Sequence, residues 1–149
     1  MKYKILCVGK VKEKFYRDEI ERLMGLIRKR GNIIDVIELQ DLKIPDNLKI
    51  SSVEGFLEKE CSPMLDKIEG SDYVIALCIE GREMTTAKHR SIVDKAYDMG
   101  KECITYVIGG SLGLPEKIKQ RADMKLSFSK MTFPHQIMRV VLLEEIYHL

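Results

Sequence analysis

Short apolar runs alternate along the chain with longer segments in which apolar residues recur every three or four positions. The short runs predict β-strands, and the periodic segments predict helices. The predicted strands are residues 3–8, 33–39, 73–79, 104–108 and 125–128. The predicted helices are residues 13–30, 53–68, 86–99, 116–122 and a last helix from residue 134 to the C-terminus.

Turn and cap residues bound several of these helices. Gly31 and Gly100 follow the first and third helices, where glycine commonly ends a helix. Pro134 stands at the start of the last helix, where a missing backbone N–H is tolerated. Ser51 and Glu54 have the spacing of a capping box, which predicts that the second helix begins with reciprocal side-chain hydrogen bonds.

The predicted strands are continuously apolar and do not alternate, which is typical of a parallel sheet covered by helices on both faces. Strands that alternate with helices indicate an α/β layered domain. The 149 residues fit one ordinary domain, and no repeat, low-complexity segment or linker divides them. We therefore expect one α/β domain over residues 1–149, with a surface loop at residues 40–52, where no period is clear.

Composition narrows the class of protein. Hydrophobic residues make up 45% of the chain and charged residues 32%, which is typical of a soluble globular protein. No apolar stretch approaches the roughly 20 residues of a membrane span, and the N-terminus lacks the features of a signal peptide. The cysteines have no metal-ligand spacing, and most lie in or beside apolar runs. We expect a cytoplasmic protein without a membrane segment or a metal.

The net charge of +2 is small, but basic residues gather near the N-terminus. Lys10, Lys12, Lys14 and Arg17 form a cluster that could meet phosphate groups. A solvated helix face is the alternative interpretation of such a charge run.

Several common catalytic motifs are absent. The chain has no G-x-G-x-x-G fingerprint, no P-loop, no H-E-x-x-H metal motif and no G-x-S-x-G nucleophile elbow. An enzyme with this sequence would have to bind its cofactor by another route.

The C-terminal third carries the most informative segments. The predicted strand 104–108 runs directly into Gly109, Gly110 and, after Ser111 and Leu112, Gly113. Glycines after a parallel strand let the backbone turn sharply and approach a ligand beyond the carboxyl ends of the strands. A tight turn with no ligand is the alternative interpretation of this loop.

The last helix is apolar around much of its circumference, so more than its own sheet should cover it. A subunit interface accounts for this pattern, and a central helix deep within one domain is the alternative. His135 and Arg139 are four residues apart and share one face of the helix. A cation among so many apolar residues requires a partner, which is either a structural carboxylate or an anion of the ligand.

These segments, VIGGSLGL and LSFSKMTFPHQIMRVVLLEEIY, together with KILCVGKVKEKFY near the N-terminus, resemble the RlmH family of SPOUT methyltransferases. The resemblance spans nearly the whole chain. It implies a SPOUT-type, Rossmann-like parallel sheet with a C-terminal deep trefoil knot. It also implies that S-adenosyl-L-methionine binds in the knot, that the chain forms a homodimer through its C-terminal helix, and that it methylates N3 of a pseudouridine in 23S rRNA on the assembled ribosome.

The resemblance also assigns site residues. The cofactor-binding residues that it implies are Leu77, Gly109, Gly110, Phe128, Ser129, Lys130, Met131, Thr132 and Phe133. We further expect His135 and Arg139 to be catalytic, because the imide N3 must lose its proton and the developing anion benefits from a nearby cation. Arg139 gripping an RNA phosphate is the alternative.

Two other functions are also compatible with the sequence. The chain stops at Leu149, where the family members continue into a tail rich in basic and aromatic residues. A catalytically impaired dimer that binds the cofactor or the ribosome without turnover is therefore the alternative function. A small flavodoxin-like signalling module also fits the alternation of strands and helices, although it does not explain the apolar last helix.

Overall fold

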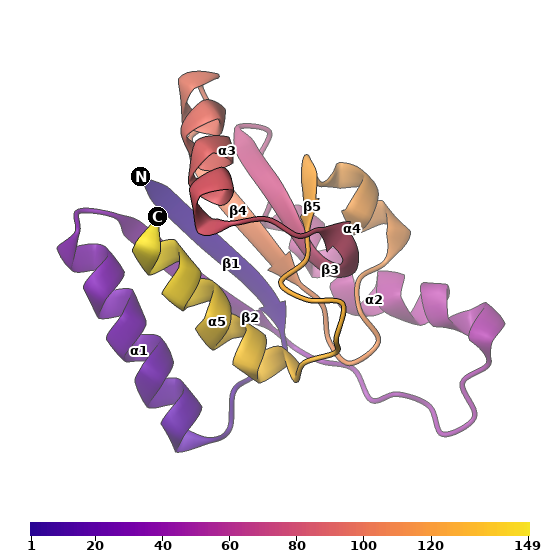
Figure 1. The fold of residues 1–149 in the computed structure, drawn as a ribbon. Helices are drawn as coiled ribbons and strands as arrows, with labels where there is room; N and C mark the ends of the chain where they lie inside the picture. The colour runs from indigo at the N-terminus through magenta and orange to yellow at the C-terminus, as the bar shows by residue number, and fades with distance from the viewer.

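One parallel sheet organises the protein, as a computed structural model of residues 1–149 shows (Figure 1). Its strands are β1 (Lys2–Val8), β2 (Ile33–Leu39), β3 (Asp72–Arg82), β4 (Cys103–Ile108) and β5 (Met124–Leu126). They lie in the order β2-β1-β4-β3-β5, and every pairing is parallel. The predicted parallel α/β fold is confirmed. β3 extends further than expected, to Arg82, and β5 ends earlier, at Leu126.

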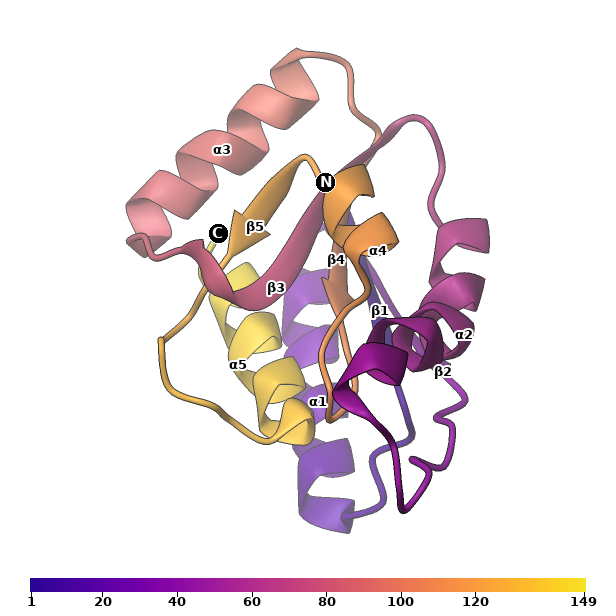
Figure 2. The same cartoon turned by 90° about the vertical axis from the view of Figure 1, so that its right-hand side faces the viewer.

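Helices cover both faces of this sheet (Figure 2). α1 (Lys14–Lys29), α3 (Thr86–Asp98) and α5 (His135–His148) lie on one face, and α2 (Val53–Asp66) and α4 (Glu116–Arg121) lie on the other. No helix of the structure has both the length and the apolar character that crossing a membrane requires.

Each face of the sheet has its own hydrophobic core. On β1, Tyr3, Ile5 and Cys7 pack toward α1, α3 and α5, whereas Leu6 and Val8 pack toward α2 and α4. Because successive side chains of a strand point to opposite faces, both sets must be apolar. The continuous apolar runs of the sequence therefore reflect burial on both sides.

The glycines expected to end helices lie where the sequence predicted them, whereas the capping box does not form. Gly31 and Gly100 follow α1 and α3 with φ of 84° and 87°, as a helix-ending glycine requires. The predicted capping box of Ser51 and Glu54 is wrong. Ser51 lies within a short 3₁₀ turn that precedes α2, and the Glu54 carboxylate accepts a hydrogen bond from the backbone N–H of Glu116 instead (2.6 Å). Glu54 therefore satisfies a free N–H at the start of α4.

The chain crosses itself beside β5. A Cβ atom at Gly81 would lie 2.6 Å from the backbone of Leu126, and the N–H of Ser127 donates to the carbonyl of Arg82 (3.0 Å). Figure 1 shows the connection from β3 to α3 passing in front of the segment that follows β5. The predicted trefoil knot requires a crossing of this kind, and only glycine leaves room for it at position 81.

Candidate active site

A cavity of about 850 Å³ opens at the carboxyl edge of the sheet. Its walls come from the end of β3, from the loop after β4 and from the segment between β5 and α5. Ligands of open α/β sheets bind beyond the carboxyl ends of the strands, and ligand pockets commonly measure roughly 300–1,000 Å³. Both the place and the size suit a small organic ligand.

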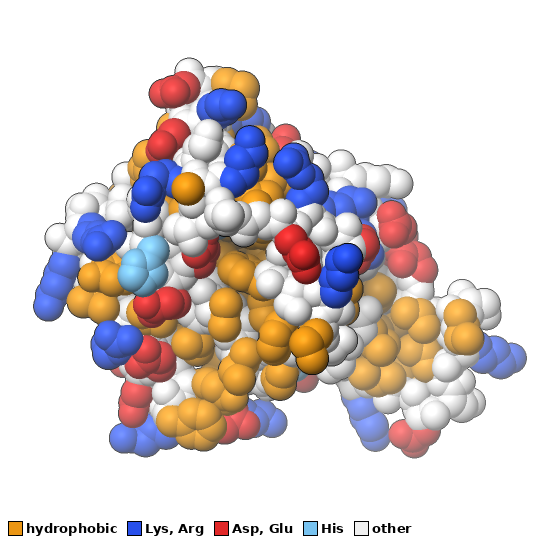
Figure 3. Space-filling model, in the orientation of Figure 1, with side chains coloured by type: hydrophobic (Ala, Val, Ile, Leu, Met, Phe, Trp, Pro, Cys, Tyr) orange, Lys and Arg blue, Asp and Glu red, His pale blue; other side chains and the backbone are white.

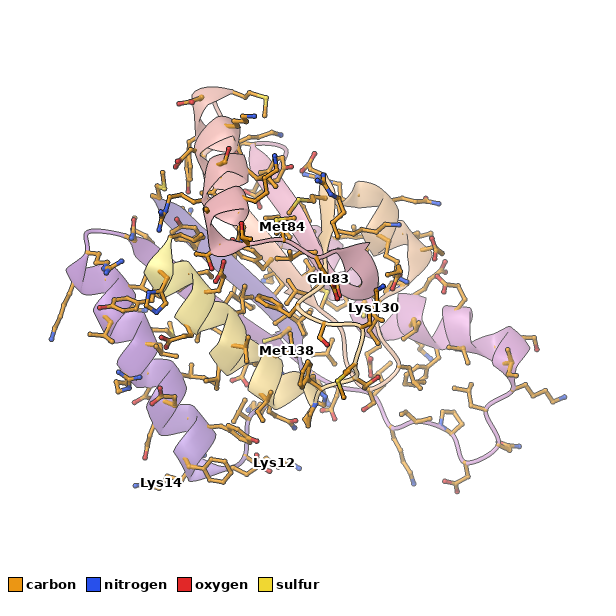
Figure 4. The ribbon with its side chains drawn as sticks, viewed as in Figure 1. Lys12, Lys14, Glu83, Met84, Lys130 and Met138 are labelled. Carbon is orange, nitrogen blue, oxygen red and sulfur yellow. The ribbon has the colours of Figure 1, made fainter.

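Most of the site residues expected from the sequence line this cavity. They are Leu77, Gly109, Gly110, Phe128, Ser129, Met131, Thr132, Phe133 and His135. Lys130 and Arg139 do not line it. Lys130 lies on the segment between β5 and α5, and Figure 4 labels it beside Glu83 of the connection from β3 to α3 only in projection.

The glycine loop after β4 is a tight turn and also a wall of the cavity. Gly113 has φ of 91°, and its N–H donates to the carbonyl of Gly110 (3.1 Å). A Cβ atom at Gly109 would lie 2.3 Å from the carbonyl oxygen of Gly113. The turn itself therefore requires glycine at position 109, and the approach of a ligand to this loop stays a prediction.

Local hydrogen bonds hold the opposite wall, which follows β5. The Ser127 hydroxyl donates to the carbonyl of Ser129 (2.8 Å), and the Ser129 hydroxyl accepts from the N–H of Met131 (3.0 Å). The side chains of Met131 and Phe133 are exposed at the rim. This loop keeps its shape with bonds of its own, while its apolar side chains remain available to a ligand or a partner.

Charged residues of the cavity were missed by the sequence analysis. Glu80 lies 2.6 Å from the Nζ atom of Lys119, and this hydrogen bond holds the pKa of Glu80 below its ordinary value. Glu54 and Glu116 also line the cavity. One signal was present, because Glu80 directly follows the apolar run of β3, where a side chain reaches the carboxyl edge of the sheet.

His135 is the first residue of α5 and lies half-buried in the cavity wall. Burial, with a further contribution from the Arg139 cation, lowers the pKa of His135 below its ordinary value of 6.5. The imidazole is therefore neutral near pH 7, and a neutral imidazole can accept a proton.

Arg139 has a structural carboxylate as its partner. Its Nη1 donates to Glu38 (2.8 Å), and its Nη2 donates to the carbonyls of Val8 (2.6 Å) and Gly9 (2.8 Å). The side chain is 1% exposed, and its Nε has no partner. Arg139 thus ties α5 to the ends of β1 and β2, beneath the cavity and not within it.

Groups able to bind a metal are not gathered anywhere in the structure. No three residues among the histidines, cysteines, aspartates and glutamates are arranged to hold a metal ion. All four cysteines are free, and Cys7, Cys61 and Cys103 are buried. Cys78 is half-buried and lines the cavity.

The sheet and the cavity beyond its carboxyl edge define an α/β enzyme with a ligand-sized active site. The family model described as "Predicted SPOUT methyltransferase" matches residues 1–149, and the chain belongs to this family of methyltransferases. The family resemblance seen in the sequence is confirmed, and the flavodoxin-like signalling module is not supported.

Two relatives match almost the whole chain. A ribosomal RNA large subunit methyltransferase H of Streptococcus uberis is 44% identical over 147 residues, which are 99% of this chain and 92% of the relative. A ribosomal RNA large subunit methyltransferase H 2 of Caldanaerobacter subterraneus subsp. tengcongensis is 43% identical over 148 residues, covering 99% and 98%. Both are named for the same methyltransferase.

A solved structure shares the fold. The crystal structure of a probable methyltransferase from Bordetella pertussis Tohama I has a TM-score of 0.58 and covers 98% of this chain and 92% of its own. The two sequences are only 8% identical, so this likeness concerns the fold alone.

Proposed function

We propose that this chain transfers a methyl group from S-adenosyl-L-methionine to N3 of a pseudouridine in 23S rRNA, on the assembled ribosome in the cytoplasm. The observation that carries the proposal is the cavity at the carboxyl edge, which is lined by most of the residues expected to bind the cofactor. The impaired dimer is not favoured, because relatives that match 99% of this chain are named as methyltransferases.

The cavity fits S-adenosyl-L-methionine chemically. Apolar side chains such as Leu77 and Phe128 suit the faces of an adenine ring. The carboxylate of Glu80 suits the cationic sulfonium and amino groups, and the ammonium of Lys119 suits the carboxylate. When bound, the sulfonium supplies an electrophilic methyl group, and the walls of the cavity orient it toward the acceptor.

The acceptor nitrogen must lose a proton, and His135 is placed to take it. An imide N3 is protonated at neutral pH, so a neutral base nearby assists attack on the methyl group. His135 stands at the cavity wall with a lowered pKa, which suits this role. Because Arg139 is committed to Glu38 and two carbonyls, we propose that it positions α5 and His135 and does not grip a phosphate.

An apolar surface supports the proposed homodimer. Figure 3 shows hydrophobic side chains gathered over α5 and the segment that precedes it. Val141 is 40% exposed and Phe133 is 45% exposed, and Phe15 of α1 is 66% exposed. Apolar patches of this kind mark contact surfaces, and a second copy of the chain is the partner that we propose.

The basic N-terminal cluster supports contact with RNA. Lys12 and Lys14 lie past the end of β1, near the start of α1 (Figure 4). Lys14 faces Asp18 (3.4 Å), whereas Lys10 and Lys12 are exposed and have no ion-pair partner. We propose that Lys10 and Lys12 contact RNA phosphates at the same edge of the sheet as the cavity.

Methyl transfer from labelled S-adenosyl-L-methionine to ribosomes that lack the modification tests this function. We expect incorporation at N3 of a pseudouridine, and a decrease in kcat of on the order of 100-fold in His135→Gln, because a positioned base contributes about that much. Affinity for S-adenosyl-L-methionine should stay within about twofold, since the base acts on the acceptor. His148→Gln, at the exposed end of α5, is the matched control.

Two outcomes would contradict these proposals. Normal cofactor binding by the wild-type chain with no incorporation would support the impaired dimer. Incorporation at full rate by His135→Gln would remove the role of His135 but leave the function standing.

A further inference from the structure

A second, smaller cavity of about 250 Å³ adjoins the first. Gly110, Ser111, Leu112 and His135 line both cavities. Its other walls come from the end of β1, from the loop after β2 and from α2. At this size it is below the roughly 300–1,000 Å³ of cofactor-sized pockets, and one flat heterocycle would fill it.

A buried carboxylate faces this second cavity. The Glu60 side chain belongs to α2 and lines the cavity, although the residue is only 5% exposed. Its Oε2 accepts a hydrogen bond from the N–H of Leu42 (3.1 Å), whereas its Oε1 accepts none from the protein. The Oε1 atom is not closed off by the protein, so it is free to accept a hydrogen bond from a ligand in this cavity.

The wall between the two cavities is thin at Gly110. A Cβ atom at this position would lie 3.0 Å from Glu60 Oε1 and 3.4 Å from a methyl group of Val8. Any side chain here would press on the Glu60 carboxylate. Glycine therefore keeps that carboxylate close to the loop that also forms the wall of the larger cavity.

The remaining walls suit a nucleobase. Phe56 and Ile44 provide apolar surface on which a flat ring can pack. Asp41 provides a second carboxylate, and its side chain is exposed at the opening of the cavity. Lys43 also lines the cavity and is exposed, which suits contact with the phosphate of the same nucleotide.

We propose that the second cavity receives the target pyrimidine, flipped out of the RNA, with its N3 toward His135 and the cofactor site, and that the carboxylates of Glu60 and Asp41 accept a hydrogen bond from its N1–H. This inference rests on the proposed function. Enzymes that modify a base commonly extrude it into a pocket and read its edge by hydrogen bonds. His135, in the wall shared by both cavities, then lies between the base and the cofactor site.

An acceptor for a second ring N–H, beyond the reacting N3, matches the chemistry of pseudouridine in particular. The sugar of pseudouridine is attached through carbon, so its ring has free N–H groups at both N1 and N3. Uridine has only the N–H at N3. A site whose carboxylate accepts the N1–H leaves that carboxylate without a donor when uridine enters, and sites built for such a hydrogen bond discriminate strongly against a ligand that lacks the group.

The substitution Glu60→Gln tests the inference, because it keeps the size of the side chain but places an amide N–H₂ where an acceptor is needed. Methyl transfer is measured on ribosomes with pseudouridine and on ribosomes with uridine at the target position. We expect kcat/KM on pseudouridine to fall by at least about 10-fold and the preference over uridine to shrink, as loss of a hydrogen bond to a charged group predicts. Affinity for S-adenosyl-L-methionine should not change.

A matched control lies on the same helix. Glu58 of α2 is partly exposed, pairs only with Lys117 (3.9 Å) and lines neither cavity, so Glu58→Gln should retain wild-type rates and preference. If Glu60→Gln lowers the thermal midpoint, its loss of activity could reflect loss of the fold. Asp41→Asn then tests the inference, because Asp41 is exposed and its side chain accepts no hydrogen bond within the protein.

The outcomes separate this inference from the proposed function. Wild-type rates and an unchanged preference in both Glu60→Gln and Asp41→Asn would overturn the inference while the function stands. A wild-type chain that methylates no ribosome would overturn the proposed function and the inference together.

Discussion

The two ends of α5 are both tied to the sheet by buried polar groups, but the chemistry of the two ties is different. At the N-terminal end, the guanidinium of Arg139 donates to Glu38 and to the carbonyls of Val8 and Gly9. At the C-terminal end, Glu145 meets His89 of α3, a group that titrates near neutral pH.

The network at the C-terminal end has all its partners in place. His89 Nδ1 lies 3.0 Å from Glu145, and Nε2 lies 2.8 Å from the Tyr106 hydroxyl. The Thr86 hydroxyl donates to the other oxygen of Glu145 (2.9 Å). A neutral imidazole that donates from Nδ1 and accepts at Nε2 satisfies this geometry. Burial lowers the pKa of His89, although Glu145 partly opposes the effect.

The two ends of α5 are therefore held to the sheet by groups of different chemistry. The end beside the active site is held by Arg139, whose partners are one carboxylate and two backbone carbonyls. The far end is fastened by a group that is neutral in the folded protein. We therefore expect acid to act on the far end through His89, while His135 adds an acid-sensitive term of its own at the near end.

The largest effect should come from breaking the near end. Arg139→Met leaves the carbonyls of Val8 and Gly9 without this donor and leaves Glu38 without its cation, although Glu38 still accepts from the N–H of Val11 (2.9 Å). We expect a loss of on the order of 3 kcal/mol in the free energy of unfolding. Urea unfolding measures this loss. Arg90→Met is the control, because Arg90 donates from the surface to the carbonyl of Leu149 (3.0 Å) and should contribute at most about 1 kcal/mol. Equal losses in the two variants would contradict the comparison.

A smaller loss is expected at the far end. His89→Leu leaves the fully buried Tyr106 hydroxyl without its acceptor, which should cost about 1–3 kcal/mol. Glu145 is 17% exposed and can turn to water, so it adds little to the cost. Urea unfolding at pH 8 isolates this packing and hydrogen-bond effect from titration. A loss above that of Arg139→Met would reverse the ranking of the two ends.

Lowering the pH should reveal the difference between the two ends of α5 more clearly than these substitutions do. The folded protein binds a proton at His89 less tightly than the unfolded chain does, whose pKa is near 6.5. The unfolded state therefore binds more protons, and stability falls as the pH drops through 6.5 toward the lower pKa of the folded state. Stability measured from pH 8 to pH 5 should fall less in His89→Gln than in the wild type. His135 contributes a similar term, which this variant keeps.

The smallest effect is expected from the exposed pair on the outer side of the same helix end. Glu144 lies 2.9 Å from His148, and both side chains are at least half exposed. Exposed pairs of this kind contribute about 0–1 kcal/mol, so Glu144→Gln should change the thermal midpoint by no more than about 4 °C. A larger shift would mean that exposed charges also fasten α5.

Local rules predicted the parts of the structure that local forces determine. The glycines that end α1 and α3 were identified because a left-handed residue at a helix end needs no distant contact. The capping box failed because Ser51 continues into a 3₁₀ turn and Glu54 has a better partner in α4. A spacing in the sequence cannot show which of two helix ends a carboxylate will reach.

The family resemblance predicted most of the residues that line the larger cavity, whereas residues that tertiary contacts bring to the site were missed. Glu38, the partner of Arg139, lies on a strand 101 residues earlier, and only the arrangement of the sheet brings them together. Glu60 is surrounded in the sequence of α2 by other charged residues, and this pattern predicts an exposed side chain. Its burial depends on the loop after β2, for which the sequence has no clear period.

The central position of β1 has a consequence for the order of folding. β1 and β2 can pair early in synthesis, but Tyr3 must wait for Ile104 of β4, and the carbonyls of Val8 and Gly9 must wait for Arg139. Contacts between such distant residues form slowly and leave a strand edge open in the meantime. We therefore expect the nascent N-terminal half to need shielding until the C-terminal third arrives. The C-terminal third also completes the walls of the cavity. The open strand edge is therefore covered, and the active site is formed, in the same step.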